Sequence, residues 1–247
     1  MRAMILAAGK GTRLRPLTDS VPKPLVEVAG RPMIGFPLQL VREAGIHDVV
    51  INLHHLGHMI RDRLGDGATC GLRIQYSEED PILDTGGGIA AARRWLNGDT
   101  FALLNADTYM DLRLDEVVAV HRRTGALATM VVRPDPEARR RDAAYVDAGG
   151  RLWSLLGAHA PQAPAGLAGC ERMMYAGVMI LEPRIFEYLP AGVYSVTRDV
   201  YPRLLAAEEP LYAYVHRGYW RVLDTHEDLA AGRQEIPALL GEATRLC

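Results

Sequence analysis

The sequence has few cysteines, few aromatic residues, little net charge and no long apolar run. Its three cysteines are an odd number without a short metal-type spacing, so neither a disulfide framework nor a zinc site is expected. No apolar stretch approaches the length of a membrane span. With 28 basic and 30 acidic residues the net charge is −2, which provides no general attraction to nucleic acid or anionic membranes. We therefore expect a cytoplasmic protein without nucleic-acid or membrane partners.

The amino-terminal segment resembles a signal peptide only superficially. Its apolar stretch over residues 4–8 is interrupted by Gly9, Lys10 and Gly11 before it reaches the length of a signal sequence. The chain has 247 residues, of which 49% are apolar, and it can therefore fill the core of one large α/β domain. We expect a single domain over residues 1–247.

The chain is organised around a basic, glycine-containing loop that follows the first apolar run. Gly9 and Gly11 lack Cβ atoms where backbone N–H groups would approach an anion, and successive N–H groups in such a turn form an anion-binding concavity. Lys10, Arg13 and Lys23 add positive charge around it. The spacing fits neither a P-loop nor a dinucleotide-binding fingerprint. A tight turn with solvated basic residues is the alternative, but the residues that follow favour a phosphate site.

The pattern of apolar residues alternates between the strand and helix periods along most of the chain. Strands are expected at residues 4–8, 49–53, 72–76, 101–105, 126–132, 144–146, 152–155, 173–183, 212–216 and 219–223, and helices at 33–45, 56–64, 88–96, 114–123, 183–189, 197–207 and from 225. This alternation predicts an α/β fold of three layers, α/β/α, with a mixed, mostly parallel sheet. Ligands of such sheets bind beyond the carboxyl ends of the strands, where the glycine loop and the stretch Asn105-Ala106-Asp107 both lie.

The run from Leu6 to Leu25, followed by Pro32-Met33-Ile34, closely resembles the signature of the sugar-1-phosphate nucleotidyltransferases. Members of this family join a nucleoside triphosphate to a sugar 1-phosphate and release pyrophosphate. The resemblance extends to about residue 230 and implies a Rossmann-like, GT-A-like nucleotidyltransferase fold. It also implies Mg²⁺ as cofactor and, because relatives often form dimers or tetramers, a homo-oligomer as one option. The expected parts are a nucleotide-binding part at 1–133, an acceptor-binding part at 134–224 and a carboxyl-terminal helix at 225–247.

The same resemblance assigns roles to individual residues. Arg13, Lys23 and Asp107 are the expected catalytic residues, and Asp107 is also the expected ligand of Mg²⁺. Asp107 directly follows a buried strand, and a hard cation is usually held by one or two carboxylates plus substrate phosphates. The expected nucleotide contacts are Leu6, Ala7, Ala8, Gly9, Lys10, Gly11, Thr12, Arg13, Lys23, Asp84, Thr85, Gly86, Gly87 and Asn105. The expected acceptor contacts are Tyr175, Ala176, Gly177 and Asp224.

A second glycine-rich turn, from Asp84 to Ile89, opens a helix. Its three glycines would let the backbone approach a ligand, and a helix N-terminus offers free N–H groups. The Thr-Gly-Gly-Gly-Ile form most resembles the N-acetylmuramate 1-phosphate uridylyltransferases and the mannose 1-phosphate guanylyltransferases. A flexible turn without a ligand is the alternative.

The sequence departs from the family's pattern near its end. Members commonly carry Gly-x-Trp-x-Asp-x-Gly-Thr, but here Val222 takes the place of the aspartate and Asp224 that of the glycine. Residues two apart lie on the same face of a strand, so Asp224 could reach the same metal. It could equally cap the helix that follows. Two outcomes are therefore open: Asp224 supplies the metal's second carboxylate, or it caps the helix and the metal loses that ligand.

A second departure is the absence of the family's Glu-Lys-Pro element, whose lysine contacts the sugar phosphate. Arg133, or one of Arg139, Arg140 and Arg141, could replace that lysine, although a run of charges is more often a solvated surface. The expected function is Mg²⁺-assisted in-line transfer of a nucleotidyl group to a sugar 1-phosphate. The alternatives are transfer to a cyclitol phosphate or phosphocholine, or a nucleotide-sugar-binding regulatory protein that has lost catalysis.

Overall fold

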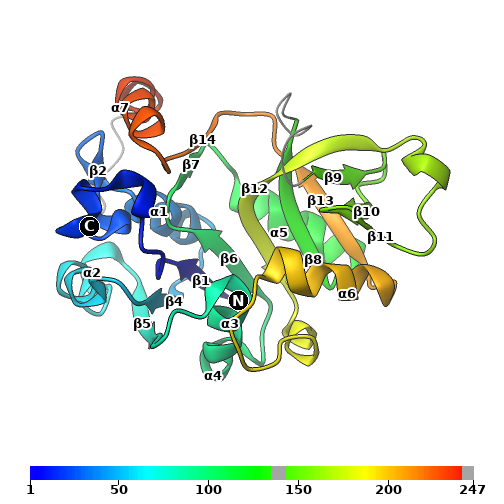
Figure 1. The fold of residues 1–247 in the computed structure, drawn as a ribbon, viewed down its shortest axis with the longest axis horizontal. Coiled ribbons are helices and arrows are strands. Elements are labelled where there is room, and N and C mark those ends of the chain that lie inside the picture. The colour runs from blue at the N-terminus through cyan, green and yellow to red at the C-terminus, as the bar shows by residue number, and fades with distance from the viewer. Residues whose placement is uncertain (135–142, 241–247) are drawn as a thin grey trace. The chain divides into compact units, whose positions relative to one another are not determined.

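The computed structural model describes residues 1–134 and 143–240, and Figure 1 shows their ribbon. The chain divides into two compact units. Unit 1 comprises Met1–Ile82, Leu104–Leu112 and the segment that begins at Gly218, and unit 2 comprises Leu83–Leu103 and Arg113–Arg217. The single domain expected from the sequence stays a prediction.

Unit 1 is built on a parallel three-stranded sheet in the order β1-β4-β5. Its strands are β1 (Arg2–Leu6), β4 (Asp48–Leu53) and β5 (Arg73–Glu78), and the connections carry α1 (Gly35–Glu43) and α2 (Gly57–Leu64). Parallel neighbours require such long crossovers, as the sequence pattern implies. Residues Ala3, Met4 and Ile5 of β1 are fully buried, which explains the uninterrupted apolar run at the start of the chain.

Two small antiparallel pairs and a helix complete unit 1. The pairs are β2 (Glu27–Val28) with β3 (Arg31–Pro32) and β7 (Thr108–Met110) with β14 (Trp220–Val222), and the helix is α7 (His226–Leu239). One apolar cluster joins these segments and contains Leu14, Val26, Val28, Met33, Phe36, Tyr109, Leu223, Leu229 and Ile236. The cluster anchors the loop after β1 and the residues before α7 to the same core.

Unit 2 carries a mixed sheet in the order β13-β8-β12-β9-β10-β11. Its strands are β8 (Ala128–Arg133), β9 (Ala143–Val146), β10 (Leu152–Leu155), β11 (Ala158–His159), β12 (Glu171–Leu181) and β13 (Leu211–Val215). The β8–β13 pair is parallel and the other pairs are antiparallel. Its helices are α3 (Asp84–Ala91), α4 (Arg93–Leu96), α5 (Leu114–Thr124) and α6 (Tyr201–Ala206). The strand β6 (Phe101–Asn105) begins in unit 2 and ends in unit 1.

The α/β class and the mixed sheet expected from the sequence are confirmed, and so are most of the elements. Two details differ. The helix expected from residue 88 begins at Asp84, so the glycine turn lies inside α3. The strand β7 was not expected, because three residues are too few to show a strand period. Its pairing with β14 joins segments more than a hundred residues apart, so neighbouring residues do not indicate it either. Among the described cysteines, Cys170 is free, while the expectation drawn from the cysteine count stays a prediction.

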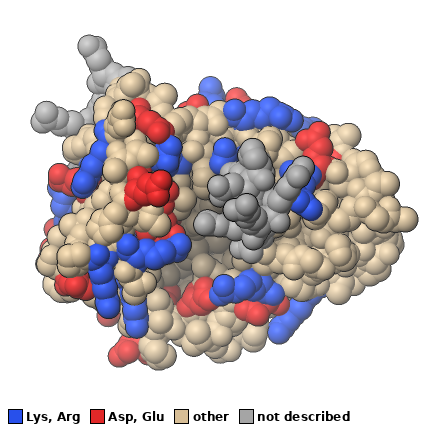
Figure 2. Space-filling view, turned by 45° about the horizontal axis from the view of Figure 1, so that its top comes forward, with Lys and Arg blue, Asp and Glu red and all other residues tan. Residues whose placement is uncertain are grey.

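The surface shown in Figure 2 carries acidic and basic side chains side by side rather than one extended patch of a single sign. This distribution agrees with the net charge of −2. In the described part of the chain no helix is both long and apolar enough to cross a membrane.

Candidate active site

The loop after β1 is held in place by contacts to its backbone. The Thr18 hydroxyl donates to the Gly11 carbonyl oxygen (2.8 Å), and the Leu14 N–H donates to the same oxygen (2.9 Å). Gly11 has a φ of +62°, which favours glycine, and a Cβ atom there would lie 2.9 Å from the Cβ of Lys23. Gly11 therefore serves the shape of the loop, because it lets the chain turn directly against Lys23.

Two buried polar residues outside the motif fix the start of this loop. The Asn52 side-chain oxygen accepts a hydrogen bond from the Ala7 N–H (2.7 Å), and its amide nitrogen donates to the Glu79 carboxylate (2.7 Å). Both side chains are almost fully buried. The sequence interpretation missed this pair. The available signal was an asparagine inside the otherwise apolar stretch 49–53, since a buried polar group needs a partner.

The N–H groups of residues 8–11 point to an anion site. Within residues 1–134 and 143–240, none of these four groups donates to another protein group. Gly9 and Lys10 are exposed, and a Cβ atom on Gly9 would meet nothing within 4 Å. Successive free N–H groups beside open space can bind phosphate oxygens. The loop thus has the features that the sequence predicts for a phosphate site.

Two carboxylates come together at the ends of β6 and β14. Ala106, which follows β6, donates its N–H to the Leu6 carbonyl oxygen (3.2 Å) and so lies beside the end of β1. The N–H of Leu223 donates to the carbonyl oxygen of Asp107 (2.8 Å), and Leu223 is fully buried in the apolar cluster of unit 1. The next residue, Asp224, is thereby held near Asp107. A strand pair therefore supplies the second carboxylate at a position two residues beyond Val222.

Lys23 joins these two carboxylates. Its Nζ lies 2.5 Å from Oδ2 of Asp107 and 2.8 Å from Oδ1 of Asp224, and its side chain is only 9% exposed. Arg13, which is 65% exposed, forms an ion pair with Oδ2 of Asp224. The formal charges of the four groups cancel. We call Arg13, Lys23, Asp107 and Asp224 the charge cluster.

The structure separates the two roles that the sequence left open for Asp224. Helix α7 is capped by Thr225, whose hydroxyl accepts from the Asp228 N–H, while the Asp228 carboxylate accepts from the Thr225 N–H. This reciprocal arrangement is a capping box. Asp224 does not cap the helix, and its carboxylate belongs to the charge cluster.

The second glycine-rich turn is packed against protein within unit 2. A Cβ atom on Gly86 would lie 2.3 Å from the Tyr194 ring, and one on Gly87 would lie 2.1 Å from the Gly192 carbonyl oxygen. The Thr85 hydroxyl accepts a hydrogen bond from a backbone N–H (2.9 Å). The Asp84 carboxylate is paired with a guanidinium (2.9 Å). Packing therefore accounts for these glycines without a ligand, and the expected nucleotide contacts at residues 84–87 stay predictions.

The expected acceptor stretch lies in β12. Tyr175 pairs with Val132 of β8, and the ladder is irregular between Tyr175 and Met179. Gly177 has a φ of +94° at this irregularity, while Ala176 is buried. Arg133 lies at the end of β8 opposite Met174. The arginines at 139–141 lie outside the described residues.

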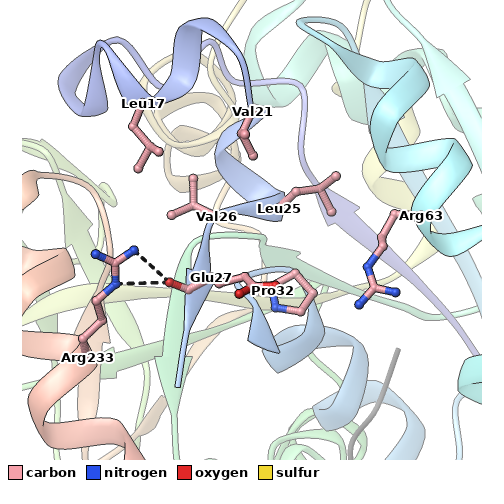
Figure 3. Close-up of a pocket in the computed structure, with 8 residues that line it drawn as sticks. All are labelled: Leu17, Val21, Leu25, Val26, Glu27, Pro32, Arg63 and Arg233. Carbon is pink, nitrogen blue, oxygen red and sulfur yellow. Dashed lines mark hydrogen bonds between the residues drawn. The ribbon is translucent and has the colours of Figure 1, made fainter. Parts of the chain in front are cut away.

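A pocket of about 350 Å³ borders the residues on either side of Lys23 (Figure 3). Its lining consists of Leu17, Val21, Leu25, Val26, Glu27, Pro32, Arg63 and Arg233. Arg233 donates to the Glu27 carbonyl oxygen (3.2 and 3.3 Å). None of the charge-cluster residues lines this pocket, and its walls are mostly apolar. Its walls therefore suit a phosphate group less well than the open loop at residues 8–11 does.

Several known proteins resemble this chain in sequence. Mannose-1-phosphate guanylyltransferase of Mycobacterium tuberculosis is 33% identical over 97% of this chain and 67% of its own length. UTP--glucose-1-phosphate uridylyltransferase of Synechocystis is 33% identical over 86% of this chain and 57% of its own. N-acetylmuramate alpha-1-phosphate uridylyltransferase of Neisseria meningitidis is 50% identical over 45% of this chain and 49% of its own. The chain thus spans between about half and two thirds of the length of these relatives.

The fold matches solved structures over nearly its whole length. A protein from Bacillus anthracis, assigned as a glucose-1-phosphate thymidylyltransferase and crystallised with sucrose, superposes with a TM-score of 0.83 at 19% identity, over 99% of this chain and 98% of that one. HddC from Yersinia pseudotuberculosis, crystallised with GMP-PN, gives 0.77 at 21% identity, over 95% and 99%. At such identities the likeness shows the fold alone. The family model described as "Nucleotidyl transferase" matches residues 2–238. The family expected from the glycine loop is confirmed, and this chain belongs to the nucleotidyl transferase family.

Proposed function

We propose that this protein transfers a nucleotidyl group from a nucleoside triphosphate to a sugar 1-phosphate, with release of pyrophosphate. The observation that carries the proposal is the charge cluster at the ends of β1, β6 and β14, together with the free N–H groups of residues 8–11. Family membership and the names of the relatives support it.

The proposed reaction needs no protein nucleophile. An oxygen of the acceptor phosphate attacks the α-phosphorus, a new P–O bond forms, and the bond to the pyrophosphate oxygen breaks. Catalysis then rests on positioning and on neutralising charge as it develops. Lys23 would neutralise charge at the α-phosphate, and Arg13 would hold the departing pyrophosphate. Lys10 and the N–H groups of residues 8–11 would steady the triphosphate.

Asp107 and Asp224 have the donor set that a hard divalent cation requires, because two carboxylates plus phosphate oxygens and water can complete its shell. In the described residues no group of three or more His, Cys, Asp or Glu side chains gathers, so substrate and water would supply the remaining ligands. We propose Mg²⁺ as this cation. When bound, it would neutralise phosphate oxygens.

The test is pyrophosphate release in the presence of Mg²⁺, with UTP, GTP, CTP, dTTP and ATP each combined with a panel of sugar, cyclitol and choline phosphates. We expect release with one base and with a sugar 1-phosphate. Release with phosphocholine or a cyclitol phosphate would replace the acceptor in the proposal. Thermal stabilisation by a nucleotide without any release would favour a regulatory protein instead.

The roles at residues 84–87 and 175–177 remain proposals drawn from the family resemblance. Direct tests are the affinities of Thr85→Val for the preferred nucleotide and of Tyr175→Phe for the preferred acceptor phosphate. A selective loss of nucleotide affinity at Thr85, or of acceptor affinity at Tyr175, would support each assignment. Unchanged affinities would remove it.

A further inference from the structure

Lys23 occupies the place between Asp107 and Asp224 where a shared cation would lie. Its Nζ is within hydrogen-bond distance of one oxygen of each carboxylate, and its side chain is almost completely buried. A metal that coordinates both carboxylates needs those oxygens at about 2.0–2.1 Å if it is Mg²⁺. The ammonium group and the metal therefore cannot hold this pair of carboxylates simultaneously.

We propose that Lys23 is a built-in counter-ion that competes with the divalent cation for Asp107 and Asp224. Metal binding then requires Lys23 to leave the pair, and a phosphate group receives it. Metal and nucleotide are bound cooperatively, because the movement of Lys23 from the carboxylates to a phosphate frees the metal ligands and also gives the nucleotide a cationic partner. The nucleotide half of this inference rests on the proposed function, whereas the competition between Lys23 and metal does not.

The charges of the cluster make such an exchange favourable only when both ligands bind. Lys23 and Arg13 balance the two carboxylates in the ligand-free protein. A metal alone would leave the Lys23 ammonium in a buried site without an anion, which is costly. Phosphate oxygens remove that cost, since the ammonium can turn towards them on its flexible stem. Arg13 is largely exposed and can turn in the same way.

The competition predicts a gain of metal affinity when the lysine charge is removed. Replacing Lys23 by Met keeps the length of the side chain but frees both carboxylates for a cation. Thermodynamic linkage also requires that nucleotide and metal strengthen each other's binding by the same factor, typically between about 5-fold and 150-fold. In Lys23→Met that mutual strengthening should shrink, because the carboxylates are already free.

The experiment is a titration of ligand-free protein with Mn²⁺, followed by electron paramagnetic resonance, with no nucleotide present. Mn²⁺ suits the same carboxylate and water ligands as Mg²⁺. We expect Lys23→Met to bind Mn²⁺ at least about tenfold more tightly than wild type, within the usual range of such couplings. Lys10→Met removes the same charge from an exposed position in the same loop and should stay within about twofold of wild type. Asp107→Asn in the Lys23→Met background should abolish the gain.

Equal or weaker Mn²⁺ binding by Lys23→Met would overturn the proposal, and so would an equal gain in Lys10→Met. If Lys23→Met does not fold, Lys23→Gln replaces it. A second test needs no variant: a non-hydrolysable nucleoside triphosphate should raise the Mn²⁺ affinity of the protein beyond what the nucleotide alone binds in solution, and no increase would count against the coupling. Absence of pyrophosphate release would refute the proposed function but not the competition, which is measured without nucleotide.

Discussion

In the loop after β1, a Cβ atom on Gly9 would meet no heavy atom within 4 Å, whereas one on Gly87 would lie 2.1 Å from the Gly192 carbonyl oxygen. The two stretches look alike in the sequence, because both contain closely spaced glycines. Gly9 and Gly11 follow an apolar run, and Gly86 to Gly88 follow a loop segment. In the first stretch the space beside the backbone is open. In the second it is filled by the segment 192–194 of the same unit.

The difference teaches that a glycine-rich turn has two distinct physical explanations. A glycine beside open space leaves room for a ligand, whereas a glycine beside a carbonyl group or a ring leaves room for the protein's own chain. Substitutions should separate the two, because the first kind affects binding and turnover and the second kind affects stability.

The largest effect is expected at Lys23, on the open side of the comparison. Lys23→Ala should lower turnover by roughly 10²–10³-fold. The substitution removes a positive charge that is held in place near the negative charge that develops in the transition state. The protein should remain folded at assay temperature, since both aspartates stay partly accessible to water. Pyrophosphate release and circular dichroism measure the two properties. Turnover within a few-fold of wild type would remove Lys23 from the catalytic proposal.

The next effect is on stability, at Gly87. Its replacement by Ala should destabilise the protein by about 1–3 kcal/mol, since overpacking costs about that much. The better helix propensity of Ala, worth roughly 1 kcal/mol, should not offset a clash with a backbone oxygen that cannot rotate away. Urea unfolding measures the change in the free energy of unfolding. An unchanged midpoint would mean that the turn is not held by packing.

Gly9→Ala is the matched substitution in the open loop. It should leave the unfolding midpoint close to that of wild type, because the added methyl group meets no protein atom. Affinity for the preferred triphosphate should fall about tenfold, which corresponds to roughly 1.4 kcal/mol of obstructed contact. Calorimetric titration checks the affinity. Loss of stability without loss of affinity would erase the contrast with Gly87.

The smallest effect concerns pH and unit 2. Burial lowers the pKa of His121 below its ordinary value of 6.5, and a hydrogen bond to Glu182 only partly opposes this shift. Because the unfolded chain binds the proton more readily, stability is full above pH 6.5 and falls as the pH drops through that value towards the folded-state pKa. His121→Gln should flatten the change in melting temperature between pH 7.5 and 5.5. An unaltered slope would assign the acid sensitivity to other groups.

Much of the candidate site follows from local pattern. Three features depend on residues that are close in sequence: the apolar run of β1, the glycines after it, and the position of Asp107 two residues after β6. Local pattern predicts such features well because strand burial and turn geometry depend on neighbouring residues. The supporting pair Asn52 and Glu79 escaped prediction, because one residue lies in β4 and the other just after β5, and only their burial explains the contact.

The sequence by itself determined the family, most of the strands and helices, and the basic loop at the end of the first strand. Only the tertiary structure decided what Asp224 does. Lys23 and Asp224 are 201 residues apart, and they meet because β14 pairs with β7 while Leu223 is buried in the core. The same holds for Gly87, whose missing Cβ has a reason only in the chain segment packed against it. Contacts between distant segments depend on the packing of the whole unit, and no local pattern encodes them.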